Sequence, residues 1–283
     1  MKQSERQQLK KERERKMQVY KRDDMIQHAR FSLTVQEQRC VLYAISKIKS
    51  TDTTFTEYTF DIRDFYALCG IDTDSYTRLK QTLKGLSDKS WWAEIDDKGT
   101  ESLLRWFSTL RTNKKSGKVT VQFHPDMVPF LLQLAKQAEE GSFFTSYGLQ
   151  YVLPMRGQYS PRLYELLKSY QKNNREWFFE IENLKKLLDC QNYKNFNDFK
   201  RFVLQPAVDE INAYSDIAID YDTEKEGRRF SRVIFYMAGK KPEALRAAEL
   251  RGSCKLDGQV SMEEIEQILR EETKKKRFFR ENG

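Results

Sequence analysis

The sequence of 283 residues has few of the motifs from which enzyme active sites are usually built. No G-x-x-x-x-G-K-[ST] segment occurs, so the phosphate-binding loop of P-loop ATPases is absent. No CxxC pair suggests a zinc site, and there is no G-x-S-x-G nucleophile elbow. Carboxylates are plentiful but alternate with lysine and arginine along helical patterns, as on solvated helix faces. The sequence therefore argues against an enzyme and predicts neither a metal nor a cofactor.

Histidine is scarcer still, with only His28 and His124, in unrelated contexts. A rolling-circle nickase would need a His-x-His-type metal site together with a nucleophilic tyrosine. That pair of histidines is absent here. Such a nickase is the third and least favoured alternative for the function.

Cysteines and long apolar runs are also few. Cys40, Cys69, Cys190 and Cys254 are far apart, and three of them sit in apolar helical patterns, which predicts buried free thiols in a reducing cytoplasm. No apolar run approaches the roughly 20 residues of a membrane-spanning helix. The N-terminal MKQSERQQLKKERERK has no apolar core, unlike a secretory signal. We expect a cytoplasmic protein without membrane contact.

What the sequence has in abundance is charge. Lysine and arginine number 50 against 42 aspartate and glutamate, so the net charge is +8. The length suffices for two domains of ordinary size.

Residues 159–235 read as helix, short strand, helix, longer helix and two strands. Leu163, Leu166 and Leu167 mark the apolar stripe of the first helix, and Ser160 before Pro161 is a helix-start signal. This order is that of a winged helix, a helix-turn-helix with a β-wing, whose usual partner is DNA.

The same order begins at residue 31. Thr34 and Glu37 predict a capping box at the start of a helix over 33–48, and Gly70 predicts a helix end. Three strands, WWAEI, LLRWFSTL and KVTVQF, then precede a further helix, HPDMVPFLLQLAKQ. The sequence thus predicts an α+β protein with two tandem winged-helix domains.

These patterns divide the chain into five parts. They are a basic N-terminal arm (1–30), a first winged-helix domain (31–140), a connector (141–157), a second winged-helix domain (158–240) and a charged helical tail (241–283). The arm is expected to be a frayed helix or disordered, either as a solubilising leader or as a nucleic-acid arm. The connector carries aromatic residues and should pack against its surroundings. The tail reads as a helix, PEALRAAELR, a GSCKLDG loop, and an amphipathic helix ending in a basic cluster.

Polar and basic residues of the second domain are candidates for DNA contact. In YKNFNDFKRFVLQ, the side opposite the apolar stripe offers an amide and a guanidinium group, which suit adenine and guanine edges in the major groove. The candidates on this helix are Lys194, Asn197, Lys200 and Arg201. The predicted wing adds Lys225, Arg228, Arg229 and Arg232, which suit phosphates or a minor groove.

The first domain offers a similar set on DSYTRLKQTLKGL. Its outward side carries Ser75, Arg78, Lys80, Gln81, Thr82 and Lys84. The turn NKKSGK is the more basic hairpin of this domain, and we expect Arg111, Lys114, Lys115 and Lys118 to contact DNA there. A solvated basic face is the alternative for either helix alone, and two such helices in equivalent positions favour DNA.

The chain resembles the theta-type plasmid replication initiators, Rep proteins that bind iterons at plasmid origins. The resemblance lies in LTVQEQRCVLYAISKI, SPRLYELLKSY, FEIENLKKLLD, YKNFNDFKRFVLQPAVDEINAYSDI and EGRRFSRVIF, and covers roughly residues 31–240. It implies a non-enzymatic initiator that binds origin repeats on double-stranded DNA and recruits host replication proteins. It also implies a homodimer through the first domain that represses its own promoter. A winged-helix transcriptional regulator is the runner-up.

Two local features give further expectations. Pro206 falls inside a helical pattern over 196–213, so we expect a kink or break near Leu204. Leu103, Leu104, Trp106, Phe107 and Leu110 do not alternate strictly. Some of them should lie on an exposed strand edge that pairs with a second copy, unless the preceding helices and the 141–157 connector cover that edge.

Overall fold

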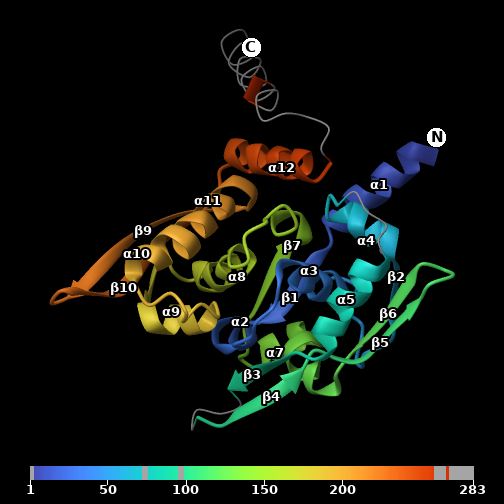
Figure 1. Cartoon of the computed structure of the whole chain (residues 1–283), viewed down its shortest axis with the longest axis horizontal. Coiled ribbons are helices and arrows are strands. Elements are labelled where there is room, and N and C mark those ends of the chain that lie inside the picture. The colour runs from blue at the N-terminus through green and yellow to red at the C-terminus, as the bar shows by residue number, and fades with distance from the viewer. Residues whose placement is uncertain (1–2, 72–75, 95–98, 258–265, 268–283) are drawn as a thin grey trace.

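The two halves of the chain repeat one order of helices and strands, as predicted (Figure 1). The computed structural model describes residues 3–71, 76–94, 99–257 and 266–267. The first half contains α3 (Val35–Ile45), β2 (Tyr58–Asp61), α4 (Ile62–Leu68), α5 (Tyr76–Ser87), β5 (Phe107–Asn113) and β6 (Lys118–Phe123). The second contains α8 (Ser160–Gln171), β8 (Glu176–Glu180), α9 (Ile181–Leu187), α10 (Phe196–Phe199), η3 (Lys200–Leu204), α11 (Gln205–Tyr214), β9 (Ile217–Glu226) and β10 (Arg229–Gly239).

Each half builds a three-stranded antiparallel sheet with its last strand in the centre. The strand orders are β2-β6-β5 and β8-β10-β9. The helices of each half cover one face of its sheet, which is the winged-helix arrangement. The fold class is therefore α+β with two tandem winged-helix domains.

Local sequence signals place the helix ends of the first domain. The Thr34 side chain accepts from the Glu37 amide at 3.3 Å, and the Glu37 carboxylate accepts from the Thr34 amide at 2.7 Å, which confirms the capping box. Gly70 follows α4 with φ +63°, a conformation that glycine adopts without strain. A Cβ at Gly70 would also lie 2.3 Å from the Leu256 carbonyl oxygen, so glycine is required there twice over.

The expected single strand LLRWFSTL is in fact two strands in different sheets. β3 (Ser90–Glu94) and β4 (Glu101–Arg105) form a separate hairpin, and β5 begins after Trp106. Trp106 is 1% exposed and lies 5.7 Å from the ring of Trp91. Trp106 is the single residue between β4 and β5, and the chain turns from one sheet to the other where this ring is buried.

The corner also decides which apolar residues are exposed. Leu104 and Trp106 are buried, and Phe107 and Leu110 are partly buried against the core. Leu103 is 56% exposed, beside its cross-strand partner Trp92 at 44%. Of the five apolar residues considered for an exposed strand edge, only Leu103 on β4 is largely exposed. Trp92 on β3, which we had not considered, is exposed beside it.

The residues expected to form an arm and a connector pair with each other. β1 (Gln18–Arg22) is antiparallel to β7 (Phe144–Gly148), and α2 (Asp23–His28) follows β1 directly. Val19, Met25 and Ile26 are buried in the common core. The structure thus differs from a frayed or disordered arm, because residues 18–28 supply core side chains. The 141–157 segment packs, as expected, but as a strand rather than a simple connector.

A buried polar cluster ties β1 and β7 to the second domain. Lys21 Nζ lies 2.6 Å from Glu165 Oε1 on α8, and the Tyr147 hydroxyl donates to the same oxygen. Burial lowers the pKa of Lys21 while Glu165 opposes the shift, and burial raises the pKa of Tyr147 well above its usual range. Both members of the ion pair are almost completely inaccessible to water.

Arg162 of α8 makes a second tie between the halves. Its Nη2 donates to the Ala29 carbonyl at 2.6 Å, and its guanidinium lies over the Phe31 ring at 4.8 Å. Burial lowers its pKa to about 10, which leaves it charged at neutral pH.

The expected helix over 124–137 is three short pieces. They are η1 (Pro125–Met127), α6 (Val128–Leu131) and α7 (Leu134–Glu139). Leu132 is extended and Gln133 has φ 53°, so the helical path is interrupted between α6 and α7.

The helix before Pro206 changes its hydrogen bonding near Leu204, where we expected a kink or break. α10 passes into the π-helical turn η3, which ends at Leu204, and α11 starts at Gln205. The backbone remains helical across this point, so the irregularity is a π turn and not a break. A proline at position 206 has no N–H to donate, which suits an altered hydrogen-bond register just before it.

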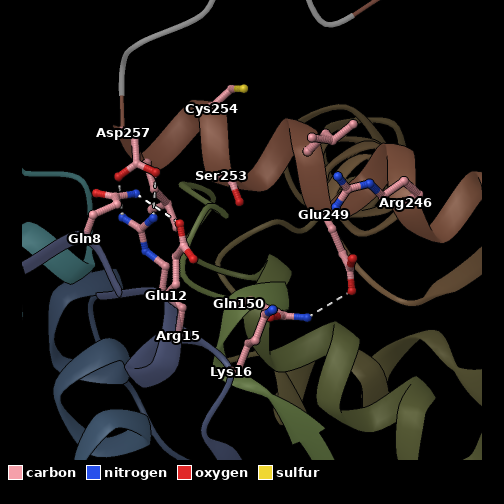
Figure 2. Close-up of a pocket in the computed structure, with 12 residues that line it drawn as sticks. Gln8, Glu12, Arg15, Lys16, Gln150, Arg246, Glu249, Ser253, Cys254 and Asp257 are labelled. Carbon is pink, nitrogen blue, oxygen red and sulfur yellow. Dashed lines mark hydrogen bonds and ion pairs between the residues drawn. The ribbon is translucent and has the colours of Figure 1, made fainter. Parts of the chain in front are cut away.

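The terminal helices lie across the two domains. α1 (Gln3–Arg15) packs on α4, and α12 (Pro242–Asp257) packs on α11 and on the turn η2 (Leu149–Tyr151). α12 continues through GSCKLD, where we expected a loop. Figure 2 shows the polar cleft between them, in which Arg15 makes two hydrogen bonds to Asp257, at 2.8 and 3.0 Å. The expected basic cluster at 274–280 lies outside the described residues.

Three cysteines are buried free thiols, as predicted, and Cys254 is partly exposed. Burial raises the pKa of Cys69 to about 11 and that of Cys190 to about 12, so both are neutral thiols at physiological pH. Within the described ranges, no helix is both long and apolar enough to cross a membrane. The same residues contain no cluster of three or more potential metal ligands.

The buried ion pair gives a stability prediction. Glu165→Leu leaves Lys21 without its partner in the core, where it must either stay charged and unpaired or lose its proton. We therefore expect a loss of about 3–5 kcal/mol in the free energy of unfolding. Glu57→Leu is the matched control: its partner Arg111 is exposed, and the expected loss is below about 1 kcal/mol. Urea unfolding of both variants measures the difference, and equal losses would contradict the role given to the pair.

Candidate nucleic-acid interface

The outer side of the α10–η3–α11 helix is lined with exposed polar and basic groups. Phe199, Val203 and Leu204 face the core, which leaves the opposite side to solvent. Asn195 starts the helix by accepting from the Asn197 amide at 2.8 Å. The predicted residues Lys194, Asn197, Lys200 and Arg201 are all exposed on this side. The helix therefore presents amide, ammonium and guanidinium groups together.

Aromatic rings hold some of these cations in place. The Arg201 guanidinium lies 5.1 Å from the Phe202 ring centroid, and Lys200 Nζ lies 5.9 Å from that of Tyr221. The Tyr221 hydroxyl in turn donates to Gln205 Oε1 at 2.9 Å. Such contacts restrict the long side chains without neutralising their charge.

Phe202 is a member of this surface that the sequence analysis did not single out. It is 51% exposed, next to Arg201, and its ring packs in parallel with Tyr193 at 6.2 Å. The available signal was its position outside the apolar stripe of Phe196, Phe199 and Val203. An exposed ring here can contact a thymine methyl group.

The β9–β10 hairpin forms the wing and projects from the body at the left of Figure 1. Its two-residue turn places Gly227 at φ +61°, a conformation that short hairpin turns assign to glycine. Lys225, Arg228 and Arg229 are exposed around the turn. Lys225 Nζ lies over the Phe230 ring at 4.5 Å.

The wing is joined to the helix by one aromatic stack. The rings of Phe196 on α10 and Phe230 on β10 are 4.1 Å apart and nearly parallel. This contact places the basic turn beside the first turn of the helix.

Arg232 lies elsewhere than the other predicted wing residues. Its Nε is 2.6 Å from Glu180 Oε1, and its Nη1 is 3.9 Å from Glu224 Oε2. Both carboxylates are its cross-strand neighbours on the outer face of the sheet. The structure therefore places Arg232 in an ion-pair network instead of at the wing tip.

The corresponding helix of the first domain is α5. Arg78, Lys80, Gln81 and Lys84 are exposed on it, while the Thr82 hydroxyl donates to the Arg78 carbonyl at 3.1 Å. Thr82 is thus partly satisfied by its own helix. The predicted Ser75 lies outside the described residues.

The β5–β6 hairpin is the wing of the first domain. Lys114, Lys115 and Lys118 are exposed, and the Asn113 side chain shapes the turn by accepting from the Lys115 amide at 3.0 Å. The Tyr76 hydroxyl donates to Thr112 Oγ1 at 2.8 Å, which ties α5 to this hairpin. Arg111 on β5 forms an ion pair with Glu57, the residue directly before β2.

Sequence comparison identifies both domains. Residues 18–168 match the family model described as "Initiator Replication protein, WH1", and residues 180–237 match "Initiator Rep protein, WH2". The chain belongs to the initiator replication protein family. The first model begins at β1, in agreement with the packing of that strand into the first domain.

Two relatives of the family are similar to this chain. A "Replication initiation protein" of Escherichia coli is 28% identical over 222 residues, which are 73% of this chain and 65% of that protein. The chain therefore spans about two thirds of the length of this curated relative. In fold, the chain is similar to the Pi initiator protein solved "in complex with iteron DNA". The TM-score is 0.66 at 22% identity, over 80% of this chain and 99% of that one.

The stack between helix and wing gives a local prediction. Phe230→Ala removes an aromatic pair worth about 0.5–1.5 kcal/mol beyond burial, so we expect faster amide hydrogen exchange in β9 and β10. Phe178→Ala is the control, because Phe178 lies on the other face of the same sheet and is 50% exposed. Similar acceleration in both variants would show that the stack does not anchor the wing.

Proposed function

We propose that this protein is a plasmid replication initiator that binds iterons, the repeats of its own replication origin. The proposal is carried by the exposed face of the α10–η3–α11 helix, where Asn197, Lys200 and Arg201 stand beside the basic turn of the wing. Family membership and the fold shared with an iteron-bound initiator support it. Action on plasmid DNA would place the protein in the cytoplasm.

The chemistry of the surface supports two roles for its residues. Arg201 and Asn197 project from the helix and can form two hydrogen bonds each with guanine and adenine edges. Arg228 and Arg229 are at the wing turn, where phosphates are the accessible groups. The helix therefore supplies specificity and the wing supplies affinity.

We further propose that the protein has no enzymatic activity and recruits host replication proteins. The exposed surfaces described above present amide, ammonium and guanidinium groups, which suit contact with DNA. Initiation would then depend on the proteins assembled at the bound origin.

A footprint on the origin beside the gene tests the DNA-binding proposal. We expect protection of repeated sites, roughly two helical turns long, if both domains contact successive major grooves. Protection of a promoter alone, with no repeats, would favour a transcriptional regulator on the same fold. Metal-dependent nicking of supercoiled origin DNA would contradict the absence of enzymatic activity.

Two substitutions separate base reading from phosphate contact. Arg201→Ala should cost about 1–3 kcal/mol and relax the preference at one base position. Arg228→Ala should weaken binding to every sequence and reduce the slope of log K against log salt by about one unit. Titration of matched and mismatched duplexes at several salt concentrations measures both. The same loss on every sequence for both variants would contradict the division of roles.

A homodimer through the first domain is also proposed, with the exposed pair Trp92 and Leu103 as its contact. Leu103→Glu should shift the dimer to monomer, because a charge would be buried at the interface. Leu9→Glu is the control, since Leu9 on α1 is exposed to a similar extent, 54%. Sedimentation at micromolar concentration measures the change, and an unaltered dimer fraction would exclude this hairpin as the interface.

A further inference from the structure

The outer face of the second domain's sheet differs in character from every surface described above. Cross-strand partners lie on the same face of a sheet, so the pairing of β8, β10 and β9 arranges this face in three rows. The rows are Glu180–Arg232–Glu224, Phe178–Ile234–Asp222 and Glu176–Tyr236–Asp220. Five carboxylates therefore surround an apolar centre, with Arg232 as the cation among them. We name these nine residues the acidic sheet face.

The apolar centre is open to solvent in the described part of the chain. Phe178 is 50% exposed and Tyr236 is 39% exposed, and Ile234 between them is partly exposed. The opposite side of the same strands carries Phe179, Val233 and Phe235, which are buried in the core. Phe178 and Tyr236 are thus not required to close the domain.

The first domain shows that the fold does not demand such a face. The equivalent rows on β2, β6 and β5 include Thr59–Thr120–Arg111 and Asp61–Lys118–Asn113. The hydroxyls of Thr59 and Thr120 are 2.9 Å apart and bond to each other. In these rows the face carries two cations, Arg111 and Lys118, against the single carboxylate of Asp61, and it has no aromatic ring.

The charge of the face identifies the class of its partner. Carboxylates repel phosphates, so DNA is excluded from this surface although the chain has a net charge of +8. Arg232 already shows the preferred contact, because it is paired with Glu180 and Glu224 while its guanidinium lies 4.8 Å from the Phe178 ring centroid. This face therefore favours a cationic side chain in two ways, through ion pairs with its carboxylates and through a cation–π contact with the aromatic ring.

We infer that the acidic sheet face is a docking site for another protein. Its occupant is a segment that carries lysine or arginine beside apolar side chains. This inference rests on the proposed function, since an initiator must engage other proteins while it remains on DNA. The face lies on the opposite side of the sheet from the helix that carries Arg201, so both surfaces can be occupied together.

The test separates replication from DNA binding in the full-length chain. Phe178→Gln removes the most exposed ring of the apolar centre, and Asp222→Lys reverses one of the charges. Glu139→Lys on α7 is the control, because it makes the same change in net charge at an exposed site of the first domain. Each variant is expressed from a plasmid that carries the gene with its own origin, and its copy number is measured. Binding of the purified proteins to origin DNA is measured in parallel.

We expect Phe178→Gln and Asp222→Lys to lower the copy number about tenfold or more, as loss of a central interface contact does. Their affinity for origin DNA should stay within about twofold of that of the Glu139→Lys control, because counterion release depends on contacts with phosphate. Retained DNA binding also shows that the variants are folded. Wild-type copy number in both face variants, or loss of DNA binding in step with copy number, would overturn the docking site.

Other occupants give different results. If the wild-type chain is a dimer that Phe178→Gln converts to a monomer, the occupant is a second copy and the inference is wrong. It is also wrong if a chain ending at Asp257, which lacks the basic 274–280 segment, reproduces the loss and Phe178→Gln adds nothing to it. Failure of the wild-type chain to bind its origin specifically would instead contradict the proposed function, whatever the face variants do.

Discussion

A buried ion pair between Lys21 and Glu165 lies where the first-domain strand β1 meets the helix α8. The pair joins β1 to α8, a helix that the first family model still covers up to residue 168 and that packs on α11, and Tyr147 donates to the same carboxylate. Two charges removed from water must satisfy each other, so separating β1 from α8 would leave both charges buried without a partner. Arg162 adds a hydrogen bond to Ala29 a short way along the chain. The two winged helices are therefore joined through buried side chains as well as through the chain that connects them.

The terminal helices reinforce this constraint from the opposite ends of the chain. α12 crosses from α11 to the C-terminal end of α4, where only a glycine at position 70 admits Leu256. Arg15 then joins α1 to α12 through Asp257 and also donates to the Leu68 carbonyl at 3.2 Å. Both helices lie outside the matched family models, which cover residues 18–168 and 180–237. They add a second brace across the two domains to the one formed by Lys21.

Sequence patterns predicted the parts of the fold that depend on local chemistry. The capping box at Thr34, the helix end at Gly70 and the order of elements over 159–235 follow from neighbouring residues, and each is confirmed. The β1–β7 pair joins residues more than a hundred positions apart. The sequence of neither strand predicts which other strand it pairs with. The apolar run LLRWFSTL is divided between two sheets at Trp106, because the ring of this residue is buried against Trp91. The sequence does not reveal this tertiary contact. For the interface, helical periodicity identified the exposed side of α10–η3–α11. The ion pairs of Arg111 and Arg232 instead join residues more than fifty positions apart in the sequence, which periodicity does not reveal.

The duplicated fold explains why the charges of the chain are distributed as they are. In both halves the third helix, α5 or α10–η3–α11, and the β-hairpin that forms the wing carry cations. A winged helix that binds DNA needs positive charge at these two places to neutralise phosphates. The outer faces of the two sheets are not restricted in this way, and they have diverged into a hydroxyl-rich face and an acidic, aromatic one. Five carboxylates held close together repel one another. The aromatic ring at their centre also exposes apolar surface to water, which is unfavourable. Arg232 offsets part of this repulsion through Glu180 and Glu224, and the remaining carboxylates and the exposed ring suit the docking site proposed above.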